Sequence, residues 1–240
     1  MNQPDPVQLF LKVSLSDDAT FANFYYHSPA QQQAVVALAA FARRDPRLGT
    51  NLAIWGASGA GLTHLLQAVT HAAFKAGCHV QYLPLRDLID QAPERVCDGL
   101  EQVEMLCLDD LDAISGQPAW EQALFHLFNR RRDTGKHLIV AAHTPIAALD
   151  VGLADLQSRL LGSLIYHIDS LDDAGKEQAL IRRANARGLD LPGETARFIL
   201  TRAPRTTQDL FQLLNRLDNA SLQHQRKLTV PFVRGLLGEV

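Results

Sequence analysis

The stretch that decides the fold of this chain is Gly56-Ala57-Ser58-Gly59-Ala60-Gly61-Leu62-Thr63. It follows the apolar, strand-like run 51–55, and it opens a helical pattern over 63–76 that Gly77 closes. A G-x-x-x-x-G-x-T spacing between a strand and a helix is that of the Walker A loop. Glycines in such a loop let successive backbone N–H groups point inward, and the helix N-terminus adds partial positive charge. The stretch therefore predicts a phosphate-binding loop, with the Thr63 hydroxyl available to Mg²⁺.

The loop departs from the pattern at Leu62, where the pattern has a lysine. That lysine contacts the β- and γ-phosphates and offsets their charge. Without it, the backbone N–H groups can still hold a diphosphate, whereas a γ-phosphate adds charge with one cation fewer to balance it. We therefore expect bound ADP or another nucleoside diphosphate, and very weak hydrolysis by the chain itself. Taken alone, the loop also fits an ordinary glycine-rich turn.

A second motif supports the nucleotide interpretation. The apolar run 105–108 ends in Asp109 and Asp110, which is the Walker B form. In such sites the first carboxylate reaches Mg²⁺ and the second orients water. Because the two motifs occur in this order and spacing, the sequence predicts a P-loop NTPase fold.

Strand and helix patterns alternate through the first part of the chain. The expected strands are 51–55, 79–83, 105–108, 138–142 and 164–168, with helices at 63–76, 85–91, 120–132 and around 156–161. This alternation predicts an α/β fold, a parallel five-stranded sheet sandwiched by helices. Later residues show only helical patterns, at 172–187, 192–202, 206–223 and 231–237. We expect an N-terminal arm at 1–20, a nucleotide-binding base at 21–168 and a helical lid at 169–240.

Composition excludes several classes. The formal net charge of −3 argues against direct binding of nucleic acid, which needs a basic surface. The three cysteines, Cys78, Cys97 and Cys107, lack metal-like spacing and are expected to be buried thiols. The N-terminus has no leader pattern, and no run approaches the ~18 apolar residues of a membrane span. We therefore expect a cytoplasmic bacterial protein that does not enter a membrane.

Three segments carry a family resemblance. Thr20-Phe21-Ala22-Asn23-Phe24-Tyr25 and the helix at 31–44 resemble the opening of the AAA+ domain of DnaA replication initiators. The Asp109-Asp110 ending of Walker B also resembles that of DnaA, whereas most AAA+ proteins have Asp-Glu at these positions. Asp155-Leu156-Gln157-Ser158-Arg159-Leu160 resembles box VII, whose arginine serves as a finger. The similarity runs from about residue 20 to the end. We therefore expect no helix-turn-helix DNA-binding domain of the DnaA type after the lid, and this expected layout resembles that of the Hda group of DnaA inactivators.

The resemblance implies a set of nucleotide-binding residues. They are Phe24, Tyr25, Gly56, Ala57, Ser58, Gly59, Ala60, Gly61, Leu62, Thr63, His64, Arg205 and Gln208. Thr63, Asp109 and Asp110 are the expected Mg²⁺ residues. The sensor 2 arginine of DnaA falls near Gln208, and Arg205, one helical turn earlier, could reach a phosphate instead. His143 or Thr144 could serve as sensor 1. The alternatives are a plain loop histidine at 143 and core packing for Phe21, Phe24 and Tyr25.

The N-terminal arm contains a candidate docking motif. Gln8-Leu9-Phe10-Leu11-Lys12-Val13 resembles the short peptide by which proteins bind the bacterial sliding clamp. Leu9, Phe10, Leu11 and Val13 can fill apolar pockets, while the Gln8 amide can hydrogen-bond at the rim. Lys12 stands where such motifs often have proline. The alternative is an N-terminal strand packed on the core.

The resemblance also implies a mechanism in trans. Held on the DNA-loaded clamp, the chain would present Arg159 to ATP on DnaA, stimulate its hydrolysis, and so negatively regulate replication initiation. DNA would be contacted only indirectly. The alternatives are a surface salt bridge for Arg159, a helicase-loader-type ATPase, or a nucleotide-dead AAA+ scaffold. A homodimer is also compatible, since a head-to-tail interface can close on itself.

Overall fold

The structure is a computed structural model that describes residues 19–202, 207–224 and 226–238. The proposed clamp motif, 8–13, and Arg205 lie outside the described residues. Gln208 lies in a described helix, but its side chain is not described.

Five parallel strands form one sheet in the order β2-β3-β4-β1-β5. The strands are β1 (Asn51–Trp55), β2 (Val80–Pro84), β3 (Met105–Asp109), β4 (His137–Ala142) and β5 (Leu164–His167). Each expected strand is present within a residue or so of its expected limits. The prediction of an α/β base with a parallel five-stranded sheet is therefore confirmed.

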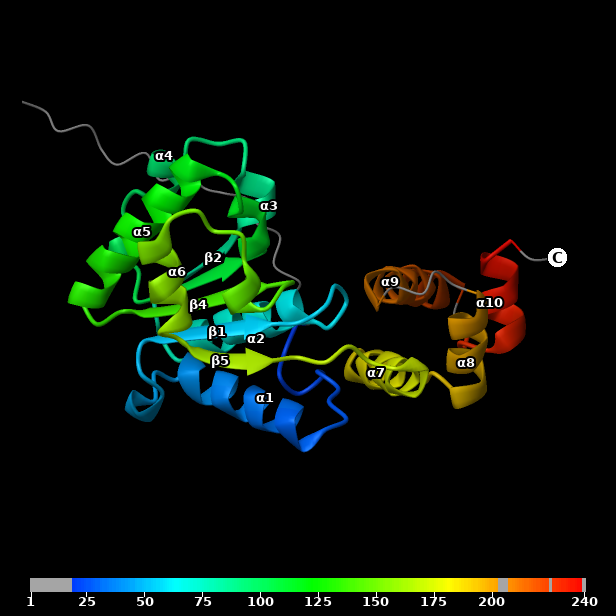
Figure 1. The fold of residues 1–240 in the computed structure, drawn as a ribbon. Coiled ribbons are helices and arrows are strands. Elements are labelled where there is room, and N and C mark those ends of the chain that lie inside the picture. Colours follow the sequence, from blue (N-terminus) through cyan, green and yellow to red (C-terminus); the bar gives the residue numbers. More distant parts are fainter. Residues whose placement is uncertain (1–18, 203–206, 225, 239–240) are drawn as a thin grey trace, which may run out of the picture.

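Helices cover both faces of this sheet (Figure 1). The base contains α1 (Pro29–Ala42), α2 (Leu62–Lys75), α3 (Leu85–Leu88), α4 (Pro93–Cys97), α5 (Pro118–Asp133) and α6 (Ala154–Leu161). The helix expected at 85–91 is shorter than expected, and α4 was not expected. Pro93 explains where α4 begins, because the residue before a proline avoids helical geometry while proline itself suits the first turn of a helix.

Alternation along the strands builds two separate cores. Leu52 and Ile54 pack against α1 and α2, whereas Ala53 between them packs into the cluster under α3 to α6. Leu106 and Leu108 likewise face the second cluster, as period-two side chains require. All three cysteines are buried and free, as expected.

The described part of the lid is a bundle of four helices beyond the carboxyl end of β5 (Figure 1). They are α7 (Asp173–Ala186), α8 (Gly193–Arg202), α9 (Thr207–His224) and α10 (Val230–Leu236). Leucine and isoleucine side chains form its own core, which includes Leu180, Ile199 and Leu214. No helix among the described residues is long and apolar enough to span a bilayer.

Two contacts position the base relative to the lid. Ser28 caps α1 by accepting the Gln31 backbone N–H, and the buried Gln31 amide donates to the Asp169 carbonyl at 2.8 Å. On the lid side, Arg182 Nε donates to the Ala22 carbonyl at 2.8 Å. The segment that precedes α1 is therefore held between the sheet and the lid.

Candidate functional site

The Walker A loop has a conformation that only glycines permit at its two tightest points. Gly59 and Gly61 have φ angles of 84° and 92°, in the left-handed region. A Cβ on Gly56 would lie 2.2 Å from the Ile168 carbonyl oxygen, and one on Gly61 would lie 2.8 Å from the Phe24 ring. The loop thus leads directly into the N-terminus of α2, where backbone N–H groups can bind an anion.

Leu62 does not take the place of the missing cation. Its side chain is 3% exposed and belongs to the core cluster beneath α1 and α2. The loop therefore relies on backbone dipoles alone at the position where the pattern supplies an ammonium group.

A pocket lies between this loop, the segment before α1 and the lid. Its lining residues are Asn23, Phe24, Tyr25, Gly59, Ala60, Gly61, His64, Leu171, Ala179, Arg183 and Phe211. Six of the expected nucleotide-binding residues thus meet here, and aromatic rings beside a glycine loop suit a base and its phosphates. Among the described residues, Gly56, Ala57, Ser58, Leu62 and Thr63 belong to the adjoining loop and do not line it, while Phe21 packs against the core.

The sequence analysis expected Arg205 and Gln208 of the lid at the nucleotide, but it did not anticipate the lid residues Arg183 and Phe211. Arg183 is 9% exposed, and its guanidinium lies 4.3 Å from the centroid of the Phe211 ring. These two residues come from α7 and α9, so no local motif signals that they share a pocket with the loop. Only the helical spacing of Ala179 and Arg183, one turn apart on α7, could have indicated a common face.

Polar and ring contacts fix the wall of the pocket that the α/β part of the protein provides. His64 Nε2 lies 2.9 Å from the Thr20 carbonyl oxygen, and its ring centroid is 5.6 Å from that of Phe24. Phe24 is itself 8% exposed and part of the core. The alternative of core packing therefore also describes Phe24, which packs inward and lines the pocket at once.

The first Walker B carboxylate is buried and hydrogen-bonded. Asp109 is 2% exposed and accepts the Tyr82 hydroxyl at 2.7 Å, with Thr63 as a further hydrogen-bond partner. Burial raises the pKa of Asp109, and burial together with the Asp109 charge raises that of Tyr82. The described residues include no cluster of three or more metal-ligating side chains. Thr63 and Asp109 therefore fit a Mg²⁺ ion only if phosphates and waters supply most of its ligands.

The second Walker B carboxylate faces basic groups. Asp110 has a φ of 54°, and its Oδ1 lies 3.0 Å from His143 Nε2 while its Oδ2 lies 3.5 Å from Arg86 Nε. Asp112 accepts the backbone N–H groups of His143 and Thr144. Both sensor 1 candidates are thus brought next to the Walker B turn, and the Asp110 carboxylate contacts Arg86 and His143.

Arg159 lies on the exposed face of α6. It makes no ion pair with any residue that the structure describes. Leu161 and Leu164, which follow it in the chain, are 45% and 38% exposed. Two exposed apolar side chains therefore follow Arg159 within five residues of the chain.

The topology separates Arg159 from the Walker A loop of its own chain. α6 leads into β5, whose first residue Leu164 pairs with Leu52 near the amino end of β1. The loop instead begins after Trp55, at the carboxyl end of β1, about 10 Å further along the strand. Figure 1 shows α6 and the lid at opposite ends of β5.

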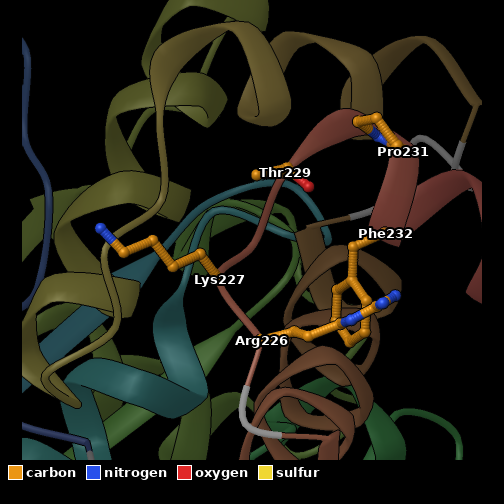
Figure 2. Close-up of a pocket in the computed structure, with 5 residues that line it drawn as sticks. All are labelled: Arg226, Lys227, Thr229, Pro231 and Phe232. Carbon is orange, nitrogen blue, oxygen red and sulfur yellow. The ribbon is translucent and has the colours of Figure 1, made fainter.

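A second pocket lies within the lid. Its lining residues are Arg226, Lys227, Thr229, Pro231 and Phe232. Figure 2 shows Lys227 extending away from Arg226 and Phe232, so the two cations do not converge on one point. We assign no ligand to this pocket.

Two family models match the chain. Residues 15–167 match the model of the bacterial DnaA ATPase domain, and residues 173–237 match that of the lid domain of Hda. Together they cover the base and the lid in the order that the resemblance implied.

Solved structures agree on the fold. The crystal structure of domain III of the Thermotoga maritima replication initiation protein DnaA has a TM-score of 0.76 at 23% identity, covering 93% of this chain and 97% of that one. AMPPCP-bound DnaA from Aquifex aeolicus has a TM-score of 0.70 at 24% identity, covering 85% of this chain and 66% of that one. The Thermotoga maritima RuvB branch migration motor has a TM-score of 0.61 at 19% identity, covering 88% and 68%. A DnaA-type ATPase domain joined to an Hda-type lid indicates a DnaA-related replication regulator. The chain belongs to the bacterial DnaA ATPase-domain family, close to Hda.

Proposed function

We propose that the chain is a negative regulator of replication initiation that uses Arg159 to stimulate hydrolysis of ATP bound to DnaA. The observation that carries the proposal is the position of Arg159. It is exposed, makes no ion pair with a described residue, and lies toward the end of β5 remote from its own Walker A loop. A guanidinium placed there can serve a neighbouring molecule's γ-phosphate, where such an arginine contributes about 10³–10⁵ in rate.

The chain's own site holds a nucleoside diphosphate in this proposal. Leu62 is buried, so the loop has no ammonium group for a γ-phosphate, while the backbone cradle is complete. Related DnaA structures bind AMPPCP, an ATP analogue, in the same fold. Thr63 and Asp109 would hold a Mg²⁺ ion, which would offset part of the phosphate charge.

The proposed division of labour follows the chain. Residues 1–20 form an arm that docks on the sliding clamp, and the residues that make this contact are Gln8, Leu9, Phe10, Leu11 and Val13. Residues 21–168 bind nucleotide and carry Arg159. Residues 169–240 form the lid. The exposed Leu161 and Leu164 would lie in the interface with DnaA, because exposed apolar side chains suit a partner contact.

The test is hydrolysis of ATP on DnaA in the presence of the clamp loaded on DNA. The wild-type chain should accelerate hydrolysis, and Arg159→Ala should abolish at least about 99% of that acceleration. Arg95→Ala removes an exposed arginine from another helix of the base and serves as the matched control. Full acceleration by Arg159→Ala would contradict the proposal, as would equal losses in both variants.

Retention of nucleotide tests the second part independently. The purified chain should release ADP or another nucleoside diphosphate on denaturation, measured by chromatography. A chain that neither retains nor takes up any diphosphate would support a nucleotide-dead scaffold instead.

A further inference from the structure

We propose that Arg183, on lid helix α7, supplies the bound diphosphate with the positive charge that the Walker A loop lacks at position 62. The inference rests on the proposed function in one respect, that the site holds a nucleoside diphosphate. It assigns the contact to the β-phosphate.

The geometry places Arg183 against the loop. Its side chain is 9% exposed and lines the same pocket as Gly59, Ala60 and Gly61. Arg183 therefore belongs to the wall of the pocket that the glycine loop also lines.

Stacking on Phe211 orients the guanidinium. The 4.3 Å separation from the ring centroid is a cation–π contact, which favours the charged group and restricts its rotamers. A planar guanidinium held in this way can donate two parallel hydrogen bonds to a phosphate. Phe211 is thus the positioning residue for Arg183.

The electrostatic balance of the pocket favours an anion. The described residues that line it include one arginine and one histidine and no acidic side chain. Leu62 is buried in the core, and the described residues that line the pocket include no lysine. Backbone N–H groups of the loop and the Arg183 guanidinium therefore offer hydrogen-bond donors to an anion in the same pocket.

A cation on the lid makes phosphate binding depend on the position of the lid. A Walker lysine binds phosphate whatever the position of the lid, whereas Arg183 reaches it only while the lid lies against the base. Bound diphosphate should therefore hold the lid in place, since a ligand stabilises the arrangement that it binds better.

The first experiment measures dissociation constants of ADP and AMP by calorimetry. Arg183→Ala should weaken ADP binding about 10- to 100-fold, the range of a charge-assisted hydrogen bond, and change AMP binding by less than about threefold. Arg183→Lys should recover part of the loss. Arg197→Ala removes another arginine of the lid, one that pairs with Glu177 at 2.8 Å, and should leave both constants unchanged.

A second variant pair distinguishes a phosphate contact from packing. Leu62→Lys restores a loop cation, so in the Arg183→Ala background it should recover ADP affinity, and the two changes should be non-additive. Thermal unfolding of each variant verifies that the chain is folded. Equal weakening of ADP and AMP, or additive effects, would overturn the inference.

These outcomes are separate from the activity on DnaA. If the wild-type chain binds ADP and Arg183→Ala binds it equally well, this inference fails while the role of Arg159 stands. If Arg159→Ala still stimulates DnaA while ADP binding depends on Arg183, the proposed function fails and this inference stands. If the wild-type chain binds no ADP, both the diphosphate site and this inference are wrong.

Discussion

The carboxylate of Glu121 on α5 accepts the backbone N–H of Leu153 at 2.9 Å, and Leu153 is the N-cap residue of the helix that carries Arg159. Leu153 has no side-chain oxygen to cap the helix itself. Glu121 is 3% exposed, so its position is fixed by packing, and its charge faces the positive end of α6. A residue far away in the sequence thereby sets where α6 begins.

We expect Glu121→Ala to destabilise the N-terminus of α6 and to reduce the stimulation of ATP hydrolysis on DnaA. Loss of the acceptor leaves a helix-terminal N–H without its partner and should lower the free energy of unfolding by about 1–3 kcal/mol. Stimulated hydrolysis should fall at least about tenfold, because a small displacement of an aligned group is costly in rate. Hydrogen exchange at the Leu153 amide, measured beside ATP hydrolysis on DnaA, reports the cap directly.

Glu121→Gln provides the control for this prediction, since its amide oxygen can still accept the Leu153 N–H. It should keep most of the stimulation. Faster exchange at Leu153 with undiminished stimulation in Glu121→Ala would show that the cap does not position Arg159.

Leu62→Lys should shift nucleotide preference toward the triphosphate. The added ammonium can meet the β- and γ-phosphates, so the ATP dissociation constant should fall by about tenfold relative to that of ADP. Turnover by the chain alone should stay very low, because the Asp110 carboxylate is paired with His143 and Arg86. Leu62→Met keeps the apolar volume without charge and should change neither constant; a rise in ATP affinity there, or none in Leu62→Lys, would contradict this view.

Arg131→Met should destabilise the base. The Arg131 guanidinium is 1% exposed and donates to the carbonyls of Leu100, Val103 and His137. Burial lowers the pKa of Arg131 to about 10, a sign of its desolvation. Methionine preserves most of the apolar stem but removes all three donated hydrogen bonds, which should lower the free energy of unfolding in urea by about 2–4 kcal/mol.

The neighbouring Arg130 supplies the comparison for that experiment. Its side chain is 45% exposed and pairs with Glu101 at 3.4 Å, so Arg130→Met should cost at most about 1 kcal/mol. Similar losses in the two variants would mean that the carbonyl contacts of Arg131 contribute little.

The parts of the fold that could be predicted from the sequence depend on local chemistry. Ser28 and Pro29 define a helix start by themselves, and the apolar runs at 51–55 and 105–108 are bounded by glycines and carboxylates. The break between α3 and α4 was missed because the pattern at 85–91 reads as one helix, and Pro93 acts two residues beyond it.

In the candidate site, too, the residues that belong to a local motif could be predicted, and those that depend on contacts between distant elements could not. Gly61 and His64 lie in or next to the Walker A motif, and Phe24 lies in a segment that the family resemblance identifies, so their meeting in one pocket could be expected. Arg183 and Glu121 depend on contacts between elements distant in the chain. No spacing in a single sequence encodes which helix faces of the lid or of α5 will meet the loop or α6.

The most direct test of the central claim asks whose triphosphate is cleaved. DnaA is loaded with radiolabelled ATP, this chain with unlabelled ADP, and the two are mixed on clamp-loaded DNA under single-turnover conditions; the label is then exchanged in a second experiment. We expect label on DnaA to convert to ADP far faster than on DnaA alone, and label on this chain to persist as ATP. Rapid cleavage of ATP carried by this chain, with no change on DnaA, would contradict the account.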